Sequence, residues 1–238
     1  MIRVYCDFDG TVARDDVGNR LFQNFVGPNA VEIVEGYLAG TKTARQCLKE
    51  ECEAVPHLTP EMLEAFVAPC EIDPYFKQFV EFCSLKEIPL TIVSDGLDFY
   101  IERILNNFGL GHLQFFSNHL TFVTREGVTK IVPEFPYEDA ECPDCGNCKR
   151  NHLLTLSGDE DIIIYIGDGI SDRCPAQYAD VVFAKRQLIK YCQECNITYH
   201  DFTHFGDVHR RLELILQRKR LKKRREAEMA RRQVFMQG

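Results

Sequence analysis

Two acidic residues, Asp7 and Asp9, follow the first apolar stretch of the chain, residues 2–6, and precede Gly10. Side chains two positions apart in an extended chain point to the same side, so the two carboxylates are expected to share one site. Like charges this close repel, and the pair therefore needs a cation or a proton on one member. An Asp-Gly turn after a strand accounts for Asp9. It leaves Asp7 unexplained, since packing at a strand end favours Val or Ile.

Two later segments place an acid in the same position. Residues 94–96 (Ser-Asp-Gly) follow an apolar run at 88–93, and residues 167–169 (Gly-Asp-Gly) follow another at 161–166. Apolar strands that alternate with helical segments predict a parallel, doubly wound sheet. Ligands bind beyond the carboxyl ends of the strands in such sheets. We therefore expect these three distant segments to converge on one site.

These residue types suit the hydrolysis of a phosphate ester. Asp7 can act as the nucleophile and form an aspartyl-phosphate. Asp9 can protonate the leaving oxygen and later deprotonate the attacking water. Lys149 supplies a fixed positive charge for the phosphoryl group and for Asp7. Ser94 and nearby backbone N–H groups can hold phosphate oxygens, as the N-terminus of a helix does.

The same oxygens predict a magnesium site. Asp168, Asp7 and the backbone carbonyl of Asp9 are hard ligands, which Mg²⁺ prefers to the thiols nearby. Asp172 stands four residues after Asp168 and is expected to orient it or a metal-bound water. The predicted metal-site residues are Asp7, Asp9, Asp168 and Asp172.

A second set of residues is expected to contact the substrate or its phosphate. The set comprises Ser94, Asp95, Gly96, Asp16 and Ser171. Asp16 has two interpretations of equal weight. It can cap the helix that follows it, or it can face a polar or cationic part of the substrate.

The segments resemble, in chain order, the four motifs of the haloacid dehalogenase superfamily of phosphatases. They are Asp7-Phe8-Asp9-Gly10-Thr11-Val12, Ser94-Asp95-Gly96, Lys149, and Gly167-Asp168-Gly169-Ile170-Ser171-Asp172. The resemblance covers residues 1–216, and the helical segment after the first motif resembles the cap of the phosphoserine-phosphatase-like branch. It implies a Rossmann-like core, Mg²⁺ dependence and a two-step phosphoryl transfer.

A narrower resemblance rests on residues 145–149, 93–99 and 182–196. These segments are similar to the 2-hydroxy-3-keto-5-methylthiopentenyl-1-phosphate phosphatases of methionine salvage and their relatives. The resemblance implies a small phosphorylated metabolite as substrate. A phosphatase for phosphoserine or a phosphoamine, or a phosphotransferase with the same core, stays open as an alternative.

The sequence thus predicts an α/β protein with a Rossmann-like doubly wound parallel sheet and an inserted helical cap. Apolar residues recur at helical spacing within 14–74. Residues 113–135 alternate in the manner of strands and contain Arg125-Glu126-Gly127, which predicts a hairpin turn. The expected bounds are 1–13 and 75–216 for the core, 14–74 for the cap, and 217–238 for a basic C-terminal helix or tail.

Composition bounds the possible locations and partners. The chain has 238 residues, of which 45% are hydrophobic and 27% charged, as in ordinary globular proteins. No apolar run approaches the roughly 20 residues that span a bilayer, and Met1 leads straight into the first strand rather than into a signal-like stretch. We expect a cytoplasmic monomer or homodimer that binds a small phosphorylated metabolite and no membrane.

The last 22 residues are basic, with nine Lys/Arg against two Asp/Glu in a chain of net charge −8. An acidic body with a basic tail argues against a nucleic-acid enzyme. The tail is expected to extend the helix at 208–216 into solvent. Contact with nucleic acid or with an acidic neighbouring subunit is the alternative, and with it a non-catalytic binding protein.

Cysteines offer one further candidate site. Eleven cysteines, an odd number, in a chain of this length argue against a disulfide framework. Cys142, Cys145 and Cys148 supply three of the four ligands of a structural zinc site. Local packing is the simpler interpretation, because the fourth ligand would have to come from Cys174, Cys192, Cys195 or a histidine.

Overall fold

The computed structural model describes residues 1–139, 142–218 and 221–237. Contacts divide the chain into two units, which we name the sheet unit and the cap unit. The sheet unit comprises Met1–Val12, Ile72–Val93 and Lys149–Gly238, and the cap unit comprises Ala13–Glu71 and Ser94–Cys148. Residues 94–148 are thus grouped with the helical segment, a grouping that the expected domain bounds do not contain.

Parallel strands build the sheet unit. They are β1 (Ile2–Cys6), the first residues of β2 (Leu90–Leu97), β5 (Ile162–Gly167), β6 (Val181–Ala184) and β7 (Tyr199–Asp201). Their order is β2-β1-β5-β6-β7, and each neighbouring pair is parallel. Every residue of β5 is buried, as expected of a strand covered on both faces. The predicted doubly wound parallel sheet is confirmed.

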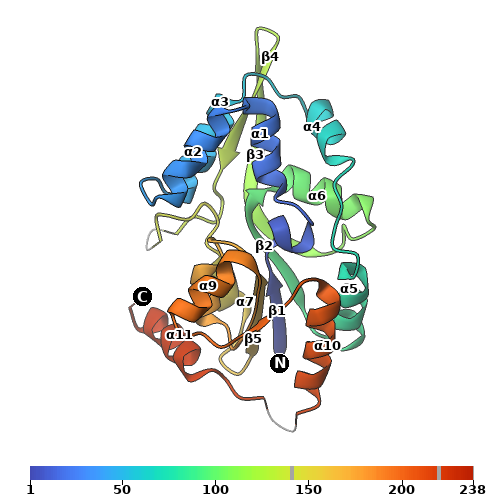
Figure 1. Ribbon diagram of the computed structural model, residues 1–238, viewed down its shortest axis with the longest axis vertical. Helices are drawn as coiled ribbons and strands as arrows, with labels where there is room; N and C mark the ends of the chain where they lie inside the picture. Colours follow the sequence, from blue (N-terminus) through green and yellow to red (C-terminus); the bar gives the residue numbers. More distant parts are fainter. Residues whose placement is uncertain (140–141, 219–220, 238) are drawn as a thin grey trace. The chain divides into compact units, whose positions relative to one another are not determined.

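Helices flank these strands. They are α5 (Phe76–Leu85), α7 (Lys149–Leu156), α8 (Arg173–Tyr178), α9 (Arg186–Glu194), α10 (Phe205–Leu216) and α11 (Arg225–Gln237). Figure 1 shows α5 and α10 on one side of β1 and β5, with α7, α9 and α11 on the other. Phe76 and Phe79 of α5 contact Phe205 of α10, with ring centroids 4.7 and 5.1 Å apart. Across the described residues, no helix is both long and apolar enough to cross a membrane.

The cap unit contains helices and a hairpin. They are α1 (Val17–Val26), α2 (Asn29–Leu38), α3 (Ala44–Ala54), α4 (Pro60–Val67) and α6 (Asp98–Asn107), with the hairpin strands β3 (Gln114–Arg125) and β4 (Val128–Glu134). The hairpin turns at Glu126 and Gly127, whose φ angles are 50° and 78°. Left-handed conformations at both residues match the twist of a tight hairpin. The predicted cap helices and hairpin are confirmed.

The hairpin is tied to the segment that follows α3. The N–H of Leu58 donates to the carbonyl of Thr129, and the N–H of Thr129 donates to Nδ1 of His57, both at 2.9 Å. The ammonium of Lys130 donates to the carbonyl of Val55 at 2.6 Å. These bonds between residues distant in sequence explain why the hairpin belongs to the cap unit.

Strand β2 differs from its prediction. The sequence predicts a strand end before Ser94, but β2 continues through residues 94–96, which we name the serine segment. Two buried asparagines hold this segment extended. The Nδ2 of Asn147 donates to the carbonyl of Ser94 at 2.8 Å, and the Nδ2 of Asn118 donates to the carbonyl of Asp95 at 2.7 Å. The expected turn is therefore replaced by a braced strand.

The basic C-terminal segment also differs from its prediction. Helix α10 ends at Leu216 and a separate helix begins at Arg225, so the expected continuous helix is wrong. The backbone N–H of Arg224 and the guanidinium of Arg231 both donate to Oδ1 of Asp180, at 3.1 and 3.0 Å. We name these three residues the C-terminal clasp. They turn the chain back onto its own sheet unit instead of into solvent.

Candidate active site

Neighbouring parallel strands place the first two acids of the site. Strands β1 and β5 pair in register, with Cys6 opposite Ile166. The backbone N–H of Asp7 continues this pairing and donates to the carbonyl of Ile166 at 2.9 Å. Asp168 follows the last residue of β5. Both acids therefore stand just beyond the carboxyl ends of adjacent central strands, where ligands bind in sheets of this kind.

The turn after β1 brings backbone close to Asp168. Gly10 adopts a left-handed conformation with φ of 68°. A Cβ at this position would lie 2.6 Å from Oδ2 of Asp168 and 2.7 Å from Nη1 of Arg186. Only glycine satisfies both the backbone angle and the close approach. The residue that follows, Thr11, directs its hydroxyl to Oδ1 of Asp168 at 3.4 Å.

Lys149 is buried among the acids. It is the first residue of α7, and its side chain is 2% exposed. Its ammonium donates to Oδ1 of Asp7 at 2.6 Å, to Oδ1 of Asp172 at 2.8 Å and to the hydroxyl of Ser171 at 2.9 Å. Each proton of the ammonium thus has an oxygen partner, and the lysine is fixed in one place.

Asp172 holds the loop after β5. Its Oδ2 accepts the backbone N–H groups of Asp168 and Gly169 at 2.8 and 2.9 Å. Its Oδ1 accepts the Tyr165 hydroxyl at 2.6 Å in addition to Lys149. The carboxylate has no exposed surface and its hydrogen-bonding capacity is filled. Asp172 thus holds the backbone at Asp168 in place, and its predicted roles toward the Asp168 carboxylate and the metal stay predictions.

Arg186 contacts the remaining acid. Its Nη1 donates to Oδ2 of Asp168 at 3.0 Å, and its side chain is about half exposed. Arg186 is also one of few non-glycine residues with positive φ, at 50°. This conformation is uncommon for a long side chain. The arginine thus places a half-exposed cation beside the buried carboxylate of Asp168.

We name Asp7, Asp168 and Asp172 the acid cluster. One oxygen from each lies within 4.8 Å of the others, and all three residues are buried. Burial raises the pKa of Asp7 well above its ordinary value, the charge of Asp172 adds to this, and Lys149 opposes it. Burial and Asp172 likewise raise the pKa of Asp168. Lys149, the half-exposed Arg186 and the partly exposed Lys185 are the cations near these three acids, and the last two oppose the rise in the pKa of Asp168.

The carboxylate oxygens that the acid cluster brings together fit a divalent cation. Mg²⁺ requires oxygen ligands and is bound by few carboxylates. Asp7 and Asp168 retain oxygen capacity for it, whereas the oxygens of Asp172 are already hydrogen-bonded. The carboxylate of Asp9, which is half-buried, is not part of the cluster. Its predicted role as acid and base stays a prediction.

The predicted substrate residues of the cap unit form a local network of their own. Ser94 is 1% exposed, and its hydroxyl accepts the N–H of Gly96 at 3.0 Å. One carboxylate oxygen of Asp95 accepts the N–H of Asn147 at 3.3 Å. The serine segment is thus held by its own side chains and by the asparagine that precedes Cys148. Substrate contact by these residues stays a prediction.

Asp16 has the capping role that one interpretation predicts. It is the N-cap of α1 and accepts the N–H of Asn19 at 2.9 Å. The structure also places a second acid near Asp16, which the sequence did not indicate. Glu51 of α3 is 7% exposed, and burial followed by the charge of Asp16 raises its pKa to about 8. Contact of Asp16 with substrate stays a prediction.

The three clustered cysteines have different contacts. Cys142 and Cys145 have sulfurs 3.6 Å apart, whereas the Cys148 sulfur lies 3.9 Å from Oδ2 of Asp139. Within the described ranges, the acid cluster is the one group with three or more ligand atoms close enough to share a metal ion. The geometry therefore favours the packing interpretation over zinc.

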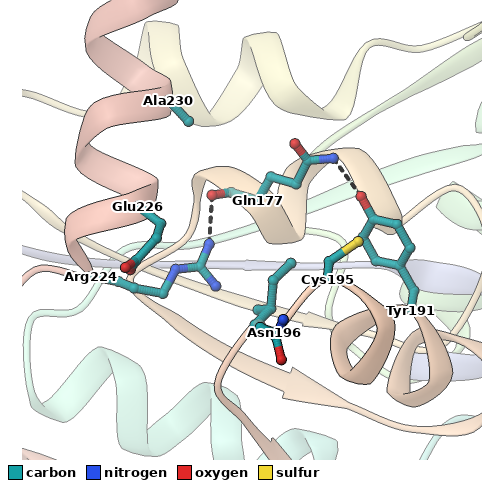
Figure 2. Close-up of a pocket in the computed structure, with 8 residues that line it drawn as sticks. Gln177, Tyr191, Cys195, Asn196, Arg224, Glu226 and Ala230 are labelled. Atoms are coloured by element: carbon teal, nitrogen blue, oxygen red, sulfur yellow. Dashed lines mark hydrogen bonds between the residues drawn. The ribbon is translucent and has the colours of Figure 1, made fainter.

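A cavity of ≈ 240 Å³ lies elsewhere in the sheet unit. Figure 2 shows Gln177, Tyr191, Cys195 and Arg224 around it. Arg224 donates to the carbonyl of Gln177 at 2.5 Å. None of the predicted site residues lines this cavity. The cavity lies between the C-terminal segment that contains Arg224 and the residues of α8 and α9 that this segment covers.

Sequence reasoning missed the residues that act through the predicted ones. Tyr165 is hidden as an ordinary strand residue, although a buried tyrosine requires a hydrogen-bond partner. Asn147 lies inside the cysteine segment that was noted for other reasons. Arg186 gives no signal in the sequence, because its contact with Asp168 depends on a left-handed backbone at a helix start.

Comparison with known proteins places the chain in a family. Residues 4–177 match the haloacid dehalogenase-like hydrolases. The chain is 30% identical over 219 residues to the 2-hydroxy-3-keto-5-methylthiopentenyl-1-phosphate phosphatase of Bacillus cereus, covering 91% of this chain and 98% of the relative. It is 31% identical over 217 residues to the enzyme of that name from Bacillus thuringiensis, covering 91% and 98%.

Solved structures agree at the level of the fold. The chain resembles a phospho-aspartyl intermediate analogue of phosphoserine phosphatase with a TM-score of 0.66 at 15% identity, over 89% of this chain and 99% of the other. The match in sequence over most of the chain settles the classification. The chain belongs to the haloacid dehalogenase-like hydrolases.

Proposed function

We propose that the chain is a Mg²⁺-dependent phosphatase that hydrolyses a small phosphomonoester through a phosphorylated Asp7. The observation that carries this proposal is Lys149, a buried cation 2.6 Å from Asp7. Burial and like charges disfavour the ionised form of Asp7. The fixed ammonium of Lys149 opposes both effects and favours the ionised carboxylate that the proposed reaction uses as its nucleophile. The phosphatases among the relatives support the same activity.

The chemistry proceeds in two steps. Oδ1 of Asp7 accepts from Lys149, which leaves Oδ2 to attack phosphorus. The bond from phosphorus to the ester oxygen breaks, and Asp9 gives that oxygen a proton. Asp9 then takes a proton from the water that attacks the aspartyl-phosphate. Inorganic phosphate leaves, and the carboxylate of Asp7 is regenerated.

The surrounding residues hold these groups in place. Asp7 and Asp168 would hold Mg²⁺, together with the backbone carbonyl of Asp9. When bound, the ion supplies positive charge for the phosphoryl oxygens. Asp172 keeps the loop of Asp168 in position through its backbone bonds. Ser171, hydrogen-bonded to the Lys149 ammonium, stands where it can contact the phosphate.

The first candidate substrate is 2-hydroxy-3-keto-5-methylthiopentenyl-1-phosphate. The proposal rests on relatives of that name that match over nearly their whole length. Ser94, Asp95, Gly96 and Asp16 are proposed to contact it. Phosphoserine or a phosphoamine is the second candidate, because the exposed carboxylate of Asp16 gives the cap unit a negative group that would favour an ammonium group.

Phosphate release from a panel of phosphomonoesters tests the proposal. The panel contains the methionine-salvage ester, phosphoserine, phosphoethanolamine, phosphocholine and an aryl phosphate, each with Mg²⁺ and with EDTA. We expect release that requires Mg²⁺ and favours one ester. A phosphorylated organic product in place of free phosphate would indicate a phosphotransferase. No turnover of any ester, together with binding of nucleic acid, would favour the binding-protein alternative.

A further inference from the structure

Two thiols in the cap unit stand close enough to react with each other. The sulfurs of Cys142 and Cys145 are 3.6 Å apart, and both residues are partly exposed. A disulfide requires a sulfur separation of about 2.05 Å. Closing the gap requires a change of roughly 1.5 Å, which lies within the reach of side-chain rotation. Pro143 and Asp144, between the two cysteines, form a turn that keeps them on the same side.

The local backbone prepares this approach. Cys142 forms an isolated antiparallel bridge with Asp139, and its N–H donates to the Asp139 carbonyl at 3.0 Å. This hydrogen bond fixes the backbone of Cys142. Burial, then the charge of Asp95, raises the pKa of the Cys145 thiol above its usual range. Cys145 is therefore the poorer initial nucleophile, and Cys142 is the thiol that would react first with an oxidant.

The same segment is joined to the serine segment. Asn147 is fully buried, and its Nδ2 donates to the carbonyls of Ser94 and Phe116 at 2.8 and 3.0 Å. Its backbone N–H donates to the carboxylate of Asp95 at 3.3 Å. Only Gly146 separates this asparagine from Cys145, and the backbone there is tightly packed. A Cβ at Gly146 would lie 2.9 Å from Oδ1 of Asn118.

We propose that Cys142 and Cys145 form a reversible disulfide whose closure displaces Asn147 and with it the serine segment. The oxidant is a low-molecular-weight disulfide. The Cys142 thiolate attacks one of its sulfurs, a mixed disulfide forms, and one small thiol leaves. Cys145 then loses its proton and attacks the Cys142 sulfur, which releases the second small thiol. Two electrons pass from the protein dithiol to the oxidant, and a dithiol reductant reverses both steps.

The bond and its effect are tested separately. The full-length protein is equilibrated with oxidised glutathione or with dithiothreitol. Its intact mass and its proteolytic peptides are then measured. We expect oxidation to remove two hydrogens, to join the peptides of Cys142 and Cys145, and to be reversed by dithiothreitol. C142S and C145S should each abolish the cross-link, whereas C195S, a change at an exposed cysteine of the sheet unit, should leave it intact.

The effect on turnover rests on the proposed function. The oxidised protein should show at least about a fivefold change in KM for the ester it hydrolyses, because a shift of an ångström in a binding segment is costly. C142S should keep the reduced value under both conditions. A protein that forms the cross-link but hydrolyses no ester would contradict the proposed function and still support the disulfide.

Three results would overturn the inference. Glutathione attached singly to Cys142 without closure onto Cys145 would show that the pair cannot meet. One equivalent of zinc in the purified protein, with Cys142, Cys145 and Cys148 protected from alkylation until a chelator is added, would assign the thiols to a metal. An unchanged KM in the cross-linked, active enzyme would show that the serine segment does not follow the loop.

Discussion

The acid cluster and the C-terminal clasp both bury carboxylates against cations in the sheet unit, but the cluster gathers several acids and the clasp has one. In the cluster, three acids lie close together, with the buried Lys149, the half-exposed Arg186 and the nearby Lys185 as their cations. In the clasp, Asp180 alone meets the guanidinium of Arg231 and the backbone N–H of Arg224, and it also accepts the N–H of Ile163 at 2.9 Å. A structural pair satisfies its charge from within the chain. The cluster brings three carboxylates together, and the proposed function assigns the remaining oxygens of Asp7 and Asp168 to Mg²⁺.

The acid cluster also shifts the pKa values of its own acids. Burial and like charges raise the pKa of Asp7 and Asp168. Arrangements that disfavour their own ionised form cost stability and are kept where chemistry requires them. Asp180 instead accepts hydrogen bonds from Ile163, Arg224 and Arg231, and breaking such a buried pair is costly. The comparison therefore predicts opposite changes in the free energy of unfolding on removing the carboxylate of Asp7 and that of Asp180. Asp172, whose oxygens are all hydrogen-bonded, should respond as Asp180 does.

The largest effect is expected at Asp7. Asp7→Asn should lower kcat by at least about 10⁴-fold, because the amide cannot form the phosphoenzyme. It should also raise the free energy of unfolding of the metal-free protein, since it removes one of three like charges. Asp201→Asn, at the exposed end of β7, is the matched control and should change neither quantity. A fully active Asp7→Asn protein would contradict the assignment of Asp7 as the nucleophile, and with it the distinction between the acid cluster and the clasp.

A smaller loss of activity is expected at Asp172. Asp172→Ala removes the acceptor for Tyr165, for Lys149 and for two backbone N–H groups. We expect kcat/KM to fall about 10²- to 10³-fold and the free energy of unfolding to fall by about 3 kcal/mol. Steady-state kinetics and urea denaturation measure the two effects. Normal kinetics in a folded variant would show that the loop of Asp168 needs no such support.

The clasp should respond in stability alone. Asp180→Ala leaves Arg231, whose side chain is 12% exposed, without its carboxylate partner. We expect a loss of about 3 kcal/mol in the free energy of unfolding and kcat/KM within about twofold of the parent. Arg232→Ala is the control, because Arg232 forms an exposed helix pair with Glu228 that contributes under about 0.5 kcal/mol. Loss of turnover in a folded Asp180→Ala protein would join the clasp to the site.

The smallest effect concerns Glu51, a buried acid of the cap unit that extends the comparison to a carboxylate without a cation. Its pKa is raised from 4.5 to about 8. The folded state then holds a proton that the unfolded state releases, so stability falls as pH rises from about 4.5 to 8. Glu51→Gln should flatten this slope and gain on the order of 2 kcal/mol over the parent at pH 9. Parallel slopes for the two proteins in urea titrations would contradict the assignment.

Predictions from the sequence succeeded where the local pattern of apolar and turn residues determines the structure. The apolar run at 162–166 predicts a buried parallel strand, and Arg125-Glu126-Gly127 predicts the hairpin turn. The convergence of Asp7 and Asp168 follows from their places after parallel strands, and the register of β1 with β5 confirms it. These inferences need only local periodicity and the rule that parallel strands end at one edge.

It failed where side chains distant in sequence decide the outcome. Asn147 and Asn118 keep β2 extended through the serine segment, and nothing near Ser94 announces them. Asp180 redirects the basic segment after α10, although the charge run alone predicts a solvated helix. Contacts of this kind override local propensity and leave no periodic signal.

The most direct test of the account is chemical trapping of the phosphoenzyme. The protein is mixed with a hydrolysed ester that carries a labelled phosphoryl group, quenched in acid within one turnover, and digested for mass spectrometry. The account predicts the label on the carboxylate of Asp7, absent from Asp7→Asn and absent when Mg²⁺ is withheld. Label on another residue, or turnover with no label on the protein in a single-turnover time course, would contradict it.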